Sequence, residues 1–373
     1  MKKNILFVTG TRADFGKVKG LIRIVDNHDE FEAKIFVTGM HMLSKYGLTA
    51  NEVDSCSFGS VYKFINQNAN DSMDVILAKT VLGLSDYVAE VRPDLIVVHG
   101  DRVEALAGAV VGSLNCILVS HIEGGEVSGT IDELIRHSVS KMAHIHFVAN
   151  ISAKQRLLQL GEQEEAIFVI GSPDLDVMFS QDLPSIDEAK KRYEIDFEEY
   201  GVFVYHPVTT ELDELGNKIR RVADALESSG RNFVVIYPNN DHGSDLIMSE
   251  IARLESRRTF RIFPSIRFEH FLTLLRHSKF MIGNSSAGVR EAPYYGIPSI
   301  NLGTRQLNRS KAKSIIHCDE DVDQILDAIS DAEKSLFKPE KEFGDGNSHH
   351  LFLRALEDIS LWKLSKQKVF VDR

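Results

Sequence analysis

Acidic residues follow two apolar runs in the first half of the chain. Asp101 stands in the stretch His99-Gly100-Asp101-Arg102, directly after one run, and Glu123 follows the next. An apolar strand that delivers an acid and an arginine to the edge of a sheet is typical of an active site, whereas the alternative is a helix cap with a surface ion pair. The functional interpretation is favoured for Asp101.

The motif at 121–126, HIEGGE, carries two glutamates around a diglycine. Glycines add chain entropy and like charges repel, so this pattern is poor for stability and favours a function over a flexible loop with solvated acids. Paired carboxylates serve as general acid and general base when their environments separate their pKa values. Glu123 is therefore a candidate catalytic residue.

Asp132 opens a segment of helical periodicity just after Ser128-Gly129-Thr130. It is a third candidate acid, but an acid in the first turn is also explained by the helix dipole. Arg136 lies one turn further on, where it would face Asp132 in a surface ion pair. The segment alone leaves both interpretations open.

Cationic and small residues at other strand ends suit a phosphate-bearing ligand. Gly10-Thr11-Arg12-Ala13-Asp14 joins the first strand to the first helix, so Arg12 can pair with a phosphate; the alternative is a plain turn with Asp14 as N-cap. The strongest phosphate candidate is GNSSAGVRE at 283–291, where backbone N–H groups and the hydroxyls of Ser285 and Ser286 open a helix. Glu291 would accept from a ribose diol, although a closely packed, capped helix is the alternative.

Three further residues lie at strand ends of the second half. His206, in Tyr205-His206-Pro207, would donate to a phosphate oxygen or be purely structural. Asn239 is either a turn residue or a contact to the pyrimidine and ribose. Arg305, in NLGTRQ at 301–306, brings another guanidinium to the same edge.

The elements that must position these residues alternate between short apolar strands and amphipathic helices. The runs are continuously apolar, which is typical of strands buried on both faces of a parallel sheet, so the pattern predicts two Rossmann-like, doubly wound α/β domains. Ligands of such folds collect at the carboxyl ends of the strands, in a cleft between the two sheets. The expected strands are 4–9, 33–38, 95–99, 117–121, 146–149, 166–170, 202–206, 233–238, 259–264, 280–284 and 298–302. The expected helices include 16–26, 75–91, 103–114, 132–143, 215–229, 245–256, 268–277 and 287–295.

A stretch rich in acids and proline at 172–199 interrupts this rhythm. We therefore expect an N-terminal domain of residues 1–171 that bears the acids and a C-terminal, UDP-binding domain of residues 172–349. One closing helix over 347–366 is expected to pack back on the first domain, completing it with residues 350–373.

Composition excludes several classes of function. The 373 residues carry 43 Lys and Arg against 54 Asp and Glu, a net charge of −11, which disfavours nucleic acid and anionic membranes as partners. The apolar run at the N-terminus is about five residues, and no run approaches the ~20 needed to span a bilayer, so it is interpreted as a strand. Cys56, Cys116 and Cys318 lack metal-ligand spacing, which predicts no structural metal and a cytoplasmic location.

Taken in order along nearly the whole chain, these motifs resemble the hydrolysing UDP-N-acetylglucosamine 2-epimerases of sialic-acid biosynthesis. The resemblance rests on GTRAD at 10–14, VTGMH at 37–41, GDR at 100–102, HIEGGEVSGTID at 121–132, HPVTT at 206–210, GNSSAGVRE at 283–291 and NLGTRQ at 301–306. Ala13-Asp14 and Gly125-Glu126 depart from the GTRPE and HVEAGLR versions of the non-hydrolysing branch.

The resemblance implies a two-domain glycosyltransferase-B fold, often as a homodimer or homotetramer. It implies release of UDP with loss of the C2 proton, giving 2-acetamidoglucal, followed by hydration to N-acetylmannosamine without NAD or a metal. It assigns proton transfer and charge stabilisation to Asp101, Glu123 and Asp132. It assigns the UDP-sugar substrate to Arg12, Arg102, His206, Asn239, Ser285, Ser286, Glu291 and Arg305.

Four alternatives remain open at this point. One is the same reaction on a UDP-2,4-diacetamido-trideoxyhexose of the legionaminic type, and another is non-hydrolysing epimerisation. A glycosyltransferase of the same fold would need an acceptor site and no acid trio. A UDP-sugar-binding regulator would keep the seat in the second half and lose the acids, whose presence disfavours it.

Overall fold

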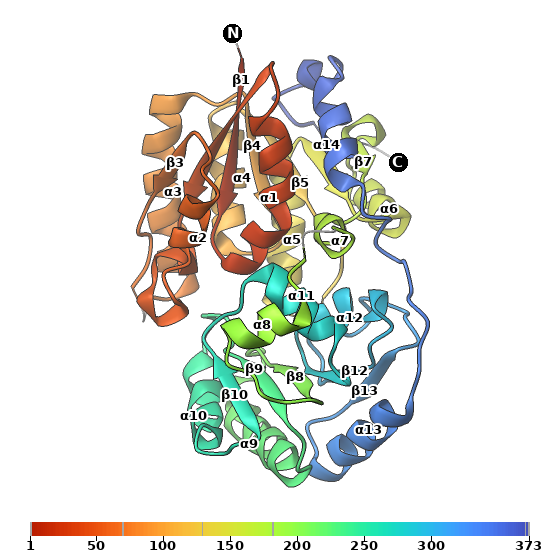
Figure 1. The fold of residues 1–373 in the computed structure, drawn as a ribbon. Helices are drawn as coiled ribbons and strands as arrows, with labels where there is room; N and C mark the ends of the chain where they lie inside the picture. The colour runs from red at the N-terminus through yellow and green to blue at the C-terminus, as the bar shows by residue number, and fades with distance from the viewer. Residues whose placement is uncertain (1, 69–70, 129, 181–182, 370, 372–373) are drawn as a thin grey trace. The chain divides into compact units, whose positions relative to one another are not determined.

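The computed structural model describes residues 2–68, 71–128, 130–180, 183–369 and 371. The chain forms two compact units (Figure 1). The N-terminal unit comprises Met1–Glu126, Asp132–Phe179 and Phe343–Arg373, and the C-terminal unit comprises Val127–Ile131 and Ser180–Glu342.

The N-terminal unit is built on a parallel sheet. Among the described residues, its seven strands run in the order β3-β2-β1-β4-β5-β6-β7, so the order reverses between β1 and β4. The strands are β1 (Lys3–Thr9), β2 (Phe31–Val37), β3 (Val61–Lys63), β4 (Leu95–His99), β5 (Leu118–Ile122), β6 (Ile145–Val148) and β7 (Ile167–Val169). The helices are α1 (Arg12–Asp26), α2 (Ala50–Ser55), α3 (Met73–Val91), α4 (Val103–Leu114), α5 (Ile131–Met142), α6 (Ile151–Gln159), α7 (Pro173–Met178) and α14 (Ser348–Glu357), with short 3-10 turns at 39–42, 44–46, 164–166 and 361–363.

The C-terminal unit repeats this plan. Its described strands are parallel and run in the order β10-β9-β8-β11-β12-β13, with the reversal between β8 and β11. The strands are β8 (Gly201–Val204), β9 (Phe233–Ile236), β10 (Phe260–Phe263), β11 (Phe280–Gly283), β12 (Ser299–Leu302) and β13 (Ile315–Cys318). The helices are α8 (Ile186–Arg192), α9 (Leu212–Ser228), α10 (Ser244–Leu254), α11 (Phe268–Arg276), α12 (Glu291–Tyr294) and α13 (Val322–Lys334), with a 3-10 turn, η4 (Ser286–Gly288).

The predicted fold class of two doubly wound α/β domains is confirmed. In the N-terminal unit, Ile5 and Phe7 of β1 share one apolar core with α1, while Gly108 of α4 packs closely on Val98 at the other face. Both faces of the sheet are therefore covered, which explains why its strands are continuously apolar. Ligand sites of this fold form where the strand order reverses, at the carboxyl ends of the strands.

The C-terminal helix α14 belongs to the N-terminal unit and packs against α1 and α7 (Figure 1). Its Phe352 is fully buried, with its ring 4.7 Å from that of Phe147 and 6.3 Å from that of Phe7. Burial of an aromatic side chain stabilises a fold by about 1.5–3 kcal/mol. Residues near the end of the chain thus complete a core that begins at its start.

Two predicted helices differ from the structure. Over 287–295, η4 and α12 replace one helix, because Pro293 lacks an N–H and its ring would clash with the carbonyl of Val289 in a continuous helix. The closing helix ends at Glu357 rather than Lys366, because the Asp358 carboxylate accepts from the backbone N–H of Ser360 at 2.8 Å and competes with helical bonding.

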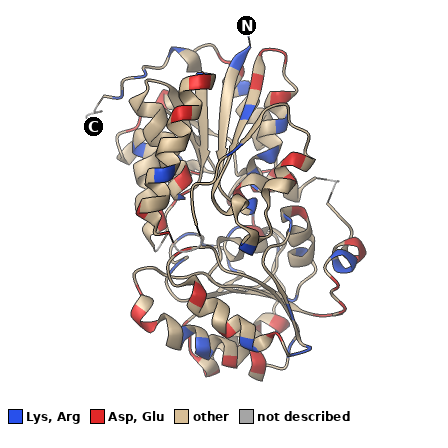
Figure 2. Ribbon diagram, turned by 90° about the vertical axis from the view of Figure 1, so that its left-hand side faces the viewer, with Lys and Arg blue, Asp and Glu red and all other residues tan. Residues whose placement is uncertain are grey.

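No described helix is long and apolar enough to span a bilayer. Acidic and basic residues are interspersed along the helices of both units in the ribbon of Figure 2. This mixture agrees with a net charge that arises from a modest excess of acids over the whole chain.

Candidate active site

The predicted acids of the N-terminal unit interact electrostatically with one buried guanidinium. Arg136 of α5 is 1% exposed and forms an ion pair with Asp101, which follows β4. Burial alone would lower the pKa of Arg136, but the carboxylates of Asp101 and then Glu126, Glu123 and Asp132 together raise it. The structure therefore brings Asp101, Glu123 and Asp132 into one electrostatic cluster.

Arg136 is a site residue that the sequence analysis considered only as a surface partner of Asp132. The structure instead buries it and pairs it with Asp101, thirty-five positions away in the chain. Its position beside the buried residues Ile135 and Val139 of α5 is the sequence feature that indicates burial.

Glu123 lies at the end of β5 and is 4% exposed. Its Oε1 accepts a hydrogen bond from Ser172 Oγ at 3.0 Å and lies 3.3 Å from His99 Nε2 and 3.7 Å from Lys17 Nζ. Its backbone is left-handed, with φ of 67°, a strained conformation for a side-chain-bearing residue that is typical of functional sites. Glu123 is thus a buried acid held between a hydroxyl, an imidazole and a cation.

The diglycine after Glu123 is required by close packing. A Cβ on Gly124 would lie 2.8 Å from Ser140 Oγ, and one on Gly125, at φ 75°, would lie 2.3 Å from the carbonyl oxygen of Ala153. The glycines therefore let the acid-bearing loop lie tightly against α5 and α6, which is a structural reason for the diglycine, and the functional interpretation of the motif stays a prediction.

Lys17 and Asp174 complete the surroundings of Glu123. Lys17 Nζ lies 3.3 Å from Asp174 Oδ2, and both side chains are largely buried. Sequence reasoning missed Lys17, Ser172 and Asp174, because the contacts join α1, the end of β5 and the start of α7, which lie far apart in the chain. For Lys17, the sequence did offer an indication of burial, because this lysine stands beside the apolar positions of α1.

The two arginines predicted to bind phosphate are held by glutamates. Arg12 Nε lies 2.8 Å from Glu52 Oε2, and Arg102 Nε lies 3.5 Å from Glu104 Oε2. Both glutamates are buried, so each guanidinium is oriented at the end of β1 or β4. Their contact with phosphate stays a prediction.

Asp14 takes part in capping α1, but the N-cap residue is Thr11, and Asp14 is instead the third residue of the helix. Its side chain accepts from the backbone N–H of Thr11 at 3.1 Å, while its own N–H donates to Thr11 Oγ1, so the two form a capping box. Burial raises the pKa of Asp14, although a hydrogen bond from Thr9 opposes this shift.

Two fully buried histidines support this edge of the sheet. His121 Nε2 donates to the carbonyl of Gly100 at 2.7 Å, and its Nδ1 lies 2.9 Å from Ser140 Oγ. His41 lies between the hydroxyls of Thr9 and Thr49, at 3.1 and 2.7 Å. Burial lowers the pKa of each histidine to about 3, so both are neutral at neutral pH.

These histidines predict that mild acid destabilises the protein. A folded-state pKa below the unfolded value of 6.5 gives stability that is complete above pH 6.5 and is lost as pH falls toward 3. Each histidine should lower the free energy of unfolding by about 2 kcal/mol between pH 7 and pH 5. Urea denaturation at the two pH values measures this loss. His121→Gln should reduce it and the exposed control His350→Gln should not; equal unfolding free energies at pH 7 and pH 5 in the wild type would contradict the prediction.

In the C-terminal unit, Asn284 joins the ends of β8 and β11, where the strand order reverses. Asn284 Oδ1 accepts from the backbone N–H of His206 at 2.6 Å, and Asn284 Nδ2 donates to the carbonyl of His206 at 2.9 Å. His206 Nδ1 in turn accepts from the backbone N–H of Asn239 at 3.0 Å. A neutral His206 therefore carries its proton on Nε2 and presents that atom as a donor.

Ser285 and Ser286 follow β11 in a sharp turn. The turn needs Gly283, which has a φ of 132° and whose Cβ would lie 2.0 Å from the carbonyl oxygen of Val204. Ser285 caps η4 by accepting from the N–H of Ala287 at 3.3 Å. Because the predicted helix is divided here, the loop N–H groups and hydroxyls, rather than a long helix dipole, are what this turn presents.

The remaining predicted UDP contacts lie at the same sheet edge. Arg305 Nη1 and Gln306 Nε2 both donate to the carbonyl of Asn284, at 3.2 and 3.0 Å, so they fix the turn. Glu291 is buried at the start of α12, and Asn239 also contacts Asp241. Among the described residues, no group of three or more His, Cys, Asp or Glu is arranged to hold a metal ion.

Comparison with known proteins gives the relationship of the chain. Residues 23–357 match the family model of UDP-N-acetylglucosamine 2-epimerase. A protein of Neisseria meningitidis serogroup B named UDP-N-acetylglucosamine 2-epimerase is 49% identical over 374 residues, with 99% of each chain covered. The chain belongs to the UDP-N-acetylglucosamine 2-epimerase family.

Other members of this epimerase family differ in the activity for which they are named. A Legionella pneumophila protein named UDP-N,N'-diacetylbacillosamine 2-epimerase (hydrolyzing) is 33% identical, with 97% of each chain covered. The crystal structure of UDP-GlcNAc 2-epimerase from Neisseria meningitidis bound to UDP-GlcNAc is 20% identical, covers 95% of this chain and 99% of its own, and has a TM-score of 0.80. That likeness shows a shared fold.

Proposed function

We propose that this epimerase-family protein converts UDP-N-acetylglucosamine and water to N-acetylmannosamine and UDP. The observation that carries the proposal is the cluster of Asp101, Glu123 and Asp132 around Arg136. The reaction removes a proton from C2, expels UDP from C1 and then adds water, so it needs groups that move protons and stabilise an oxocarbenium-like centre.

Within this proposal, Glu123 is the acid that exchanges protons. It is buried and lies 3.3 Å from His99 Nε2, a group able to accept or donate a proton. Asp101, paired with Arg136, keeps a negative charge and stabilises positive charge that develops at C1. Asp132, in the first turn of α5, is assigned to the hydration step.

We assign the UDP moiety to the C-terminal unit. The Nε2–H of neutral His206 and the hydroxyls and N–H groups of Ser285 and Ser286 are donors for the diphosphate. Glu291 accepts from the ribose, and Asn239 and Arg305 shape the same edge. Arg12 and Arg102 of the N-terminal unit supply cations for the departing phosphate.

Two alternatives differ from this proposal in substrate or product. The Legionella relative favours hydrolysing chemistry and suggests a diacetamido sugar, whereas the more similar Neisseria relative is named for UDP-N-acetylglucosamine. The motifs Ala13-Asp14 and Gly125-Glu126, typical of the hydrolysing branch, favour hydrolysis over return of UDP-N-acetylmannosamine.

The proposal predicts the products of one incubation. In deuterated water with UDP-N-acetylglucosamine alone, NMR should detect UDP and free N-acetylmannosamine that carries deuterium at C2. Parallel incubation with UDP-N,N'-diacetylbacillosamine tests the sugar preference. Accumulation of UDP-N-acetylmannosamine, or turnover of only the diacetamido sugar, would overturn the proposal.

A cytoplasmic location and a homodimeric or homotetrameric assembly stay predictions. Cys56, Cys116 and Cys318, all among the described residues, are not joined in disulfides, which is consistent with the proposed reducing compartment.

A further inference from the structure

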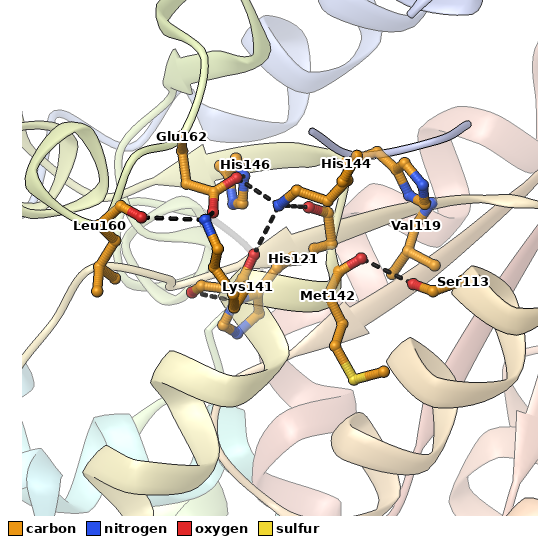
Figure 3. Close-up of polar contacts among 12 residues, drawn as sticks. Ser113, Val119, His121, Lys141, Met142, His144, His146, Leu160 and Glu162 are labelled. Carbon is orange, nitrogen blue, oxygen red and sulfur yellow. Dashed lines mark hydrogen bonds and ion pairs between the residues drawn. The ribbon is translucent and has the colours of Figure 1, made fainter. Parts of the chain in front are cut away.

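An ion cluster in the N-terminal unit is centred on the buried carboxylate of Glu162, which contacts His146 of β6 and Lys141 of α5 (Figure 3). The Glu162 side chain is 3% exposed and accepts from His146 Nε2 at 3.0 Å, from Lys141 Nζ at 3.1 Å and from Lys368 Nζ. Burial opposes its ionisation, but His146 and Lys368 outweigh this and lower the pKa of Glu162 to about 2. Glu162 is therefore an anion at neutral pH.

Lys368 comes from the C-terminal segment that follows the 3-10 turn at 361–363. Its Nζ also donates to the carbonyls of Ala143, at 2.6 Å, and Ser140, at 3.4 Å. These carbonyls lie at the C-terminal end of α5, where helical carbonyls lack intrahelical partners and a cation is favourable. Lys368 thus caps the helix that carries Asp132 and Arg136.

A second contact fixes the same segment. The backbone N–H of Val119 donates to His144 Nδ1 at 3.1 Å, so neutral His144 carries its proton on Nε2 and donates it to the carbonyl of Lys366 at 3.0 Å. This backbone contact does not depend on the Lys366 side chain, which is exposed.

A chain of contacts connects the capped end of α5 to the loop that bears one of the proposed catalytic acids. Ser140 Oγ contacts His121 Nδ1, and His121 Nε2 donates to the carbonyl of Gly100, the residue before Asp101. His121 also lies opposite His146 in the pairing of β5 with β6. Contacts therefore run without a break from Lys368 to the loop of Asp101.

We propose that Lys368 is a positioning residue for the acid cluster. By capping α5 and pairing with Glu162, it fixes the placement of Asp132 and Arg136, and through Ser140 and His121 it fixes the loop of Asp101. The expected effect of Lys368 on turnover rests on the proposed function. The expected effect of Lys368 on the stability of α5 does not depend on any substrate.

Three variants of the full chain test the proposal. Lys368→Met removes the ammonium, Lys368→Arg keeps the charge, and Lys366→Met is a matched control two residues earlier. Turnover of UDP-N-acetylglucosamine and amide hydrogen exchange of residues 131–142 are measured for each. We expect Lys368→Met to lower kcat about tenfold with KM within about twofold, and to speed exchange at the end of α5 about tenfold. Lys368→Arg should restore most of both.

The outcomes distinguish this inference from the proposed function. The inference is supported if Lys368→Met, but not Lys366→Met, shows faster amide exchange in α5 and a lower kcat. Lys368→Arg should then restore both quantities. Exchange and kcat equal to those of Lys366→Met would overturn the inference, as would failure of arginine to restore either quantity. A wild-type protein that does not turn over UDP-N-acetylglucosamine would refute the proposed function, while the exchange measurement would still decide whether Lys368 fixes α5.

Discussion

Replacing Glu123 by glutamine is expected to lower kcat by about 10²–10⁴-fold while leaving the affinity for UDP within about twofold. The amide keeps the shape of the side chain and an oxygen that accepts from Ser172 Oγ, but it cannot take up the C2 proton. UDP affinity should persist because Glu123 is not one of the proposed UDP contacts, most of which lie in the C-terminal unit. Steady-state kinetics and calorimetric titration with UDP measure the two quantities.

The control for Glu123→Gln is Glu133→Gln, on α5 beside Asp132. Glu133 makes a partly exposed contact with His137 and has no proposed role in catalysis. It should retain nearly all activity. A large loss of UDP binding in Glu123→Gln would mean that Glu123 belongs to the nucleotide site, and retention of kcat would remove it from proton transfer.

Arg136→Met should be the second severe change. Removing one partner from a buried ion pair leaves an uncompensated charge, so the free energy of unfolding should fall by about 3–5 kcal/mol. In protein that still folds, the clustered carboxylates would repel one another, so kcat/KM should fall at least about 10²-fold. The acidic limb of its pH profile should also move to higher pH, because the cation that favours the ionised acids is lost.

A conservative variant separates catalysis from folding in this prediction. Arg136→Lys keeps the charge and should fold, with a wild-type acidic limb and a smaller loss of kcat/KM, since an ammonium lacks the planar fork of a guanidinium. Urea denaturation and kcat/KM measured from pH 5 to pH 9 provide the data. An unchanged pH profile in soluble Arg136→Met would show that Arg136 does not govern the acids.

The central strands were the most predictable part of the fold. Leu95–His99 forms β4 with the predicted bounds, because a short, continuously apolar run that ends at a glycine is typical of a strand buried on both faces of a parallel sheet. The edge strands β3 and β13 were missed, since edge positions are only half covered and their sequences, with exposed Tyr62 and His317, show no apolar run.

The candidate acids were inferred from their places at the ends of strands or at the start of a helix. Asp101 and Glu123 follow β4 and β5, Asp132 lies in the first turn of α5, and all three act electrostatically on Arg136. Arg136, Lys17 and Ser172 were missed, because each adjoins a candidate acid only through a contact made in the folded state. Helical periodicity in the sequence places a buried polar residue on a helix, but it does not reveal which residue that side chain contacts.

The placement of α14 in the core of the N-terminal unit also sets an order of assembly during translation. Phe352 and Leu356 leave the ribosome only after the whole of 180–342 has been made. Residues 180–342 can thus collapse around their own sheet while the nascent N-terminal sheet still exposes the apolar surface that α14 will cover. The second half to be encoded is therefore the first that can finish folding, and the first half waits with a surface to which chaperones would bind.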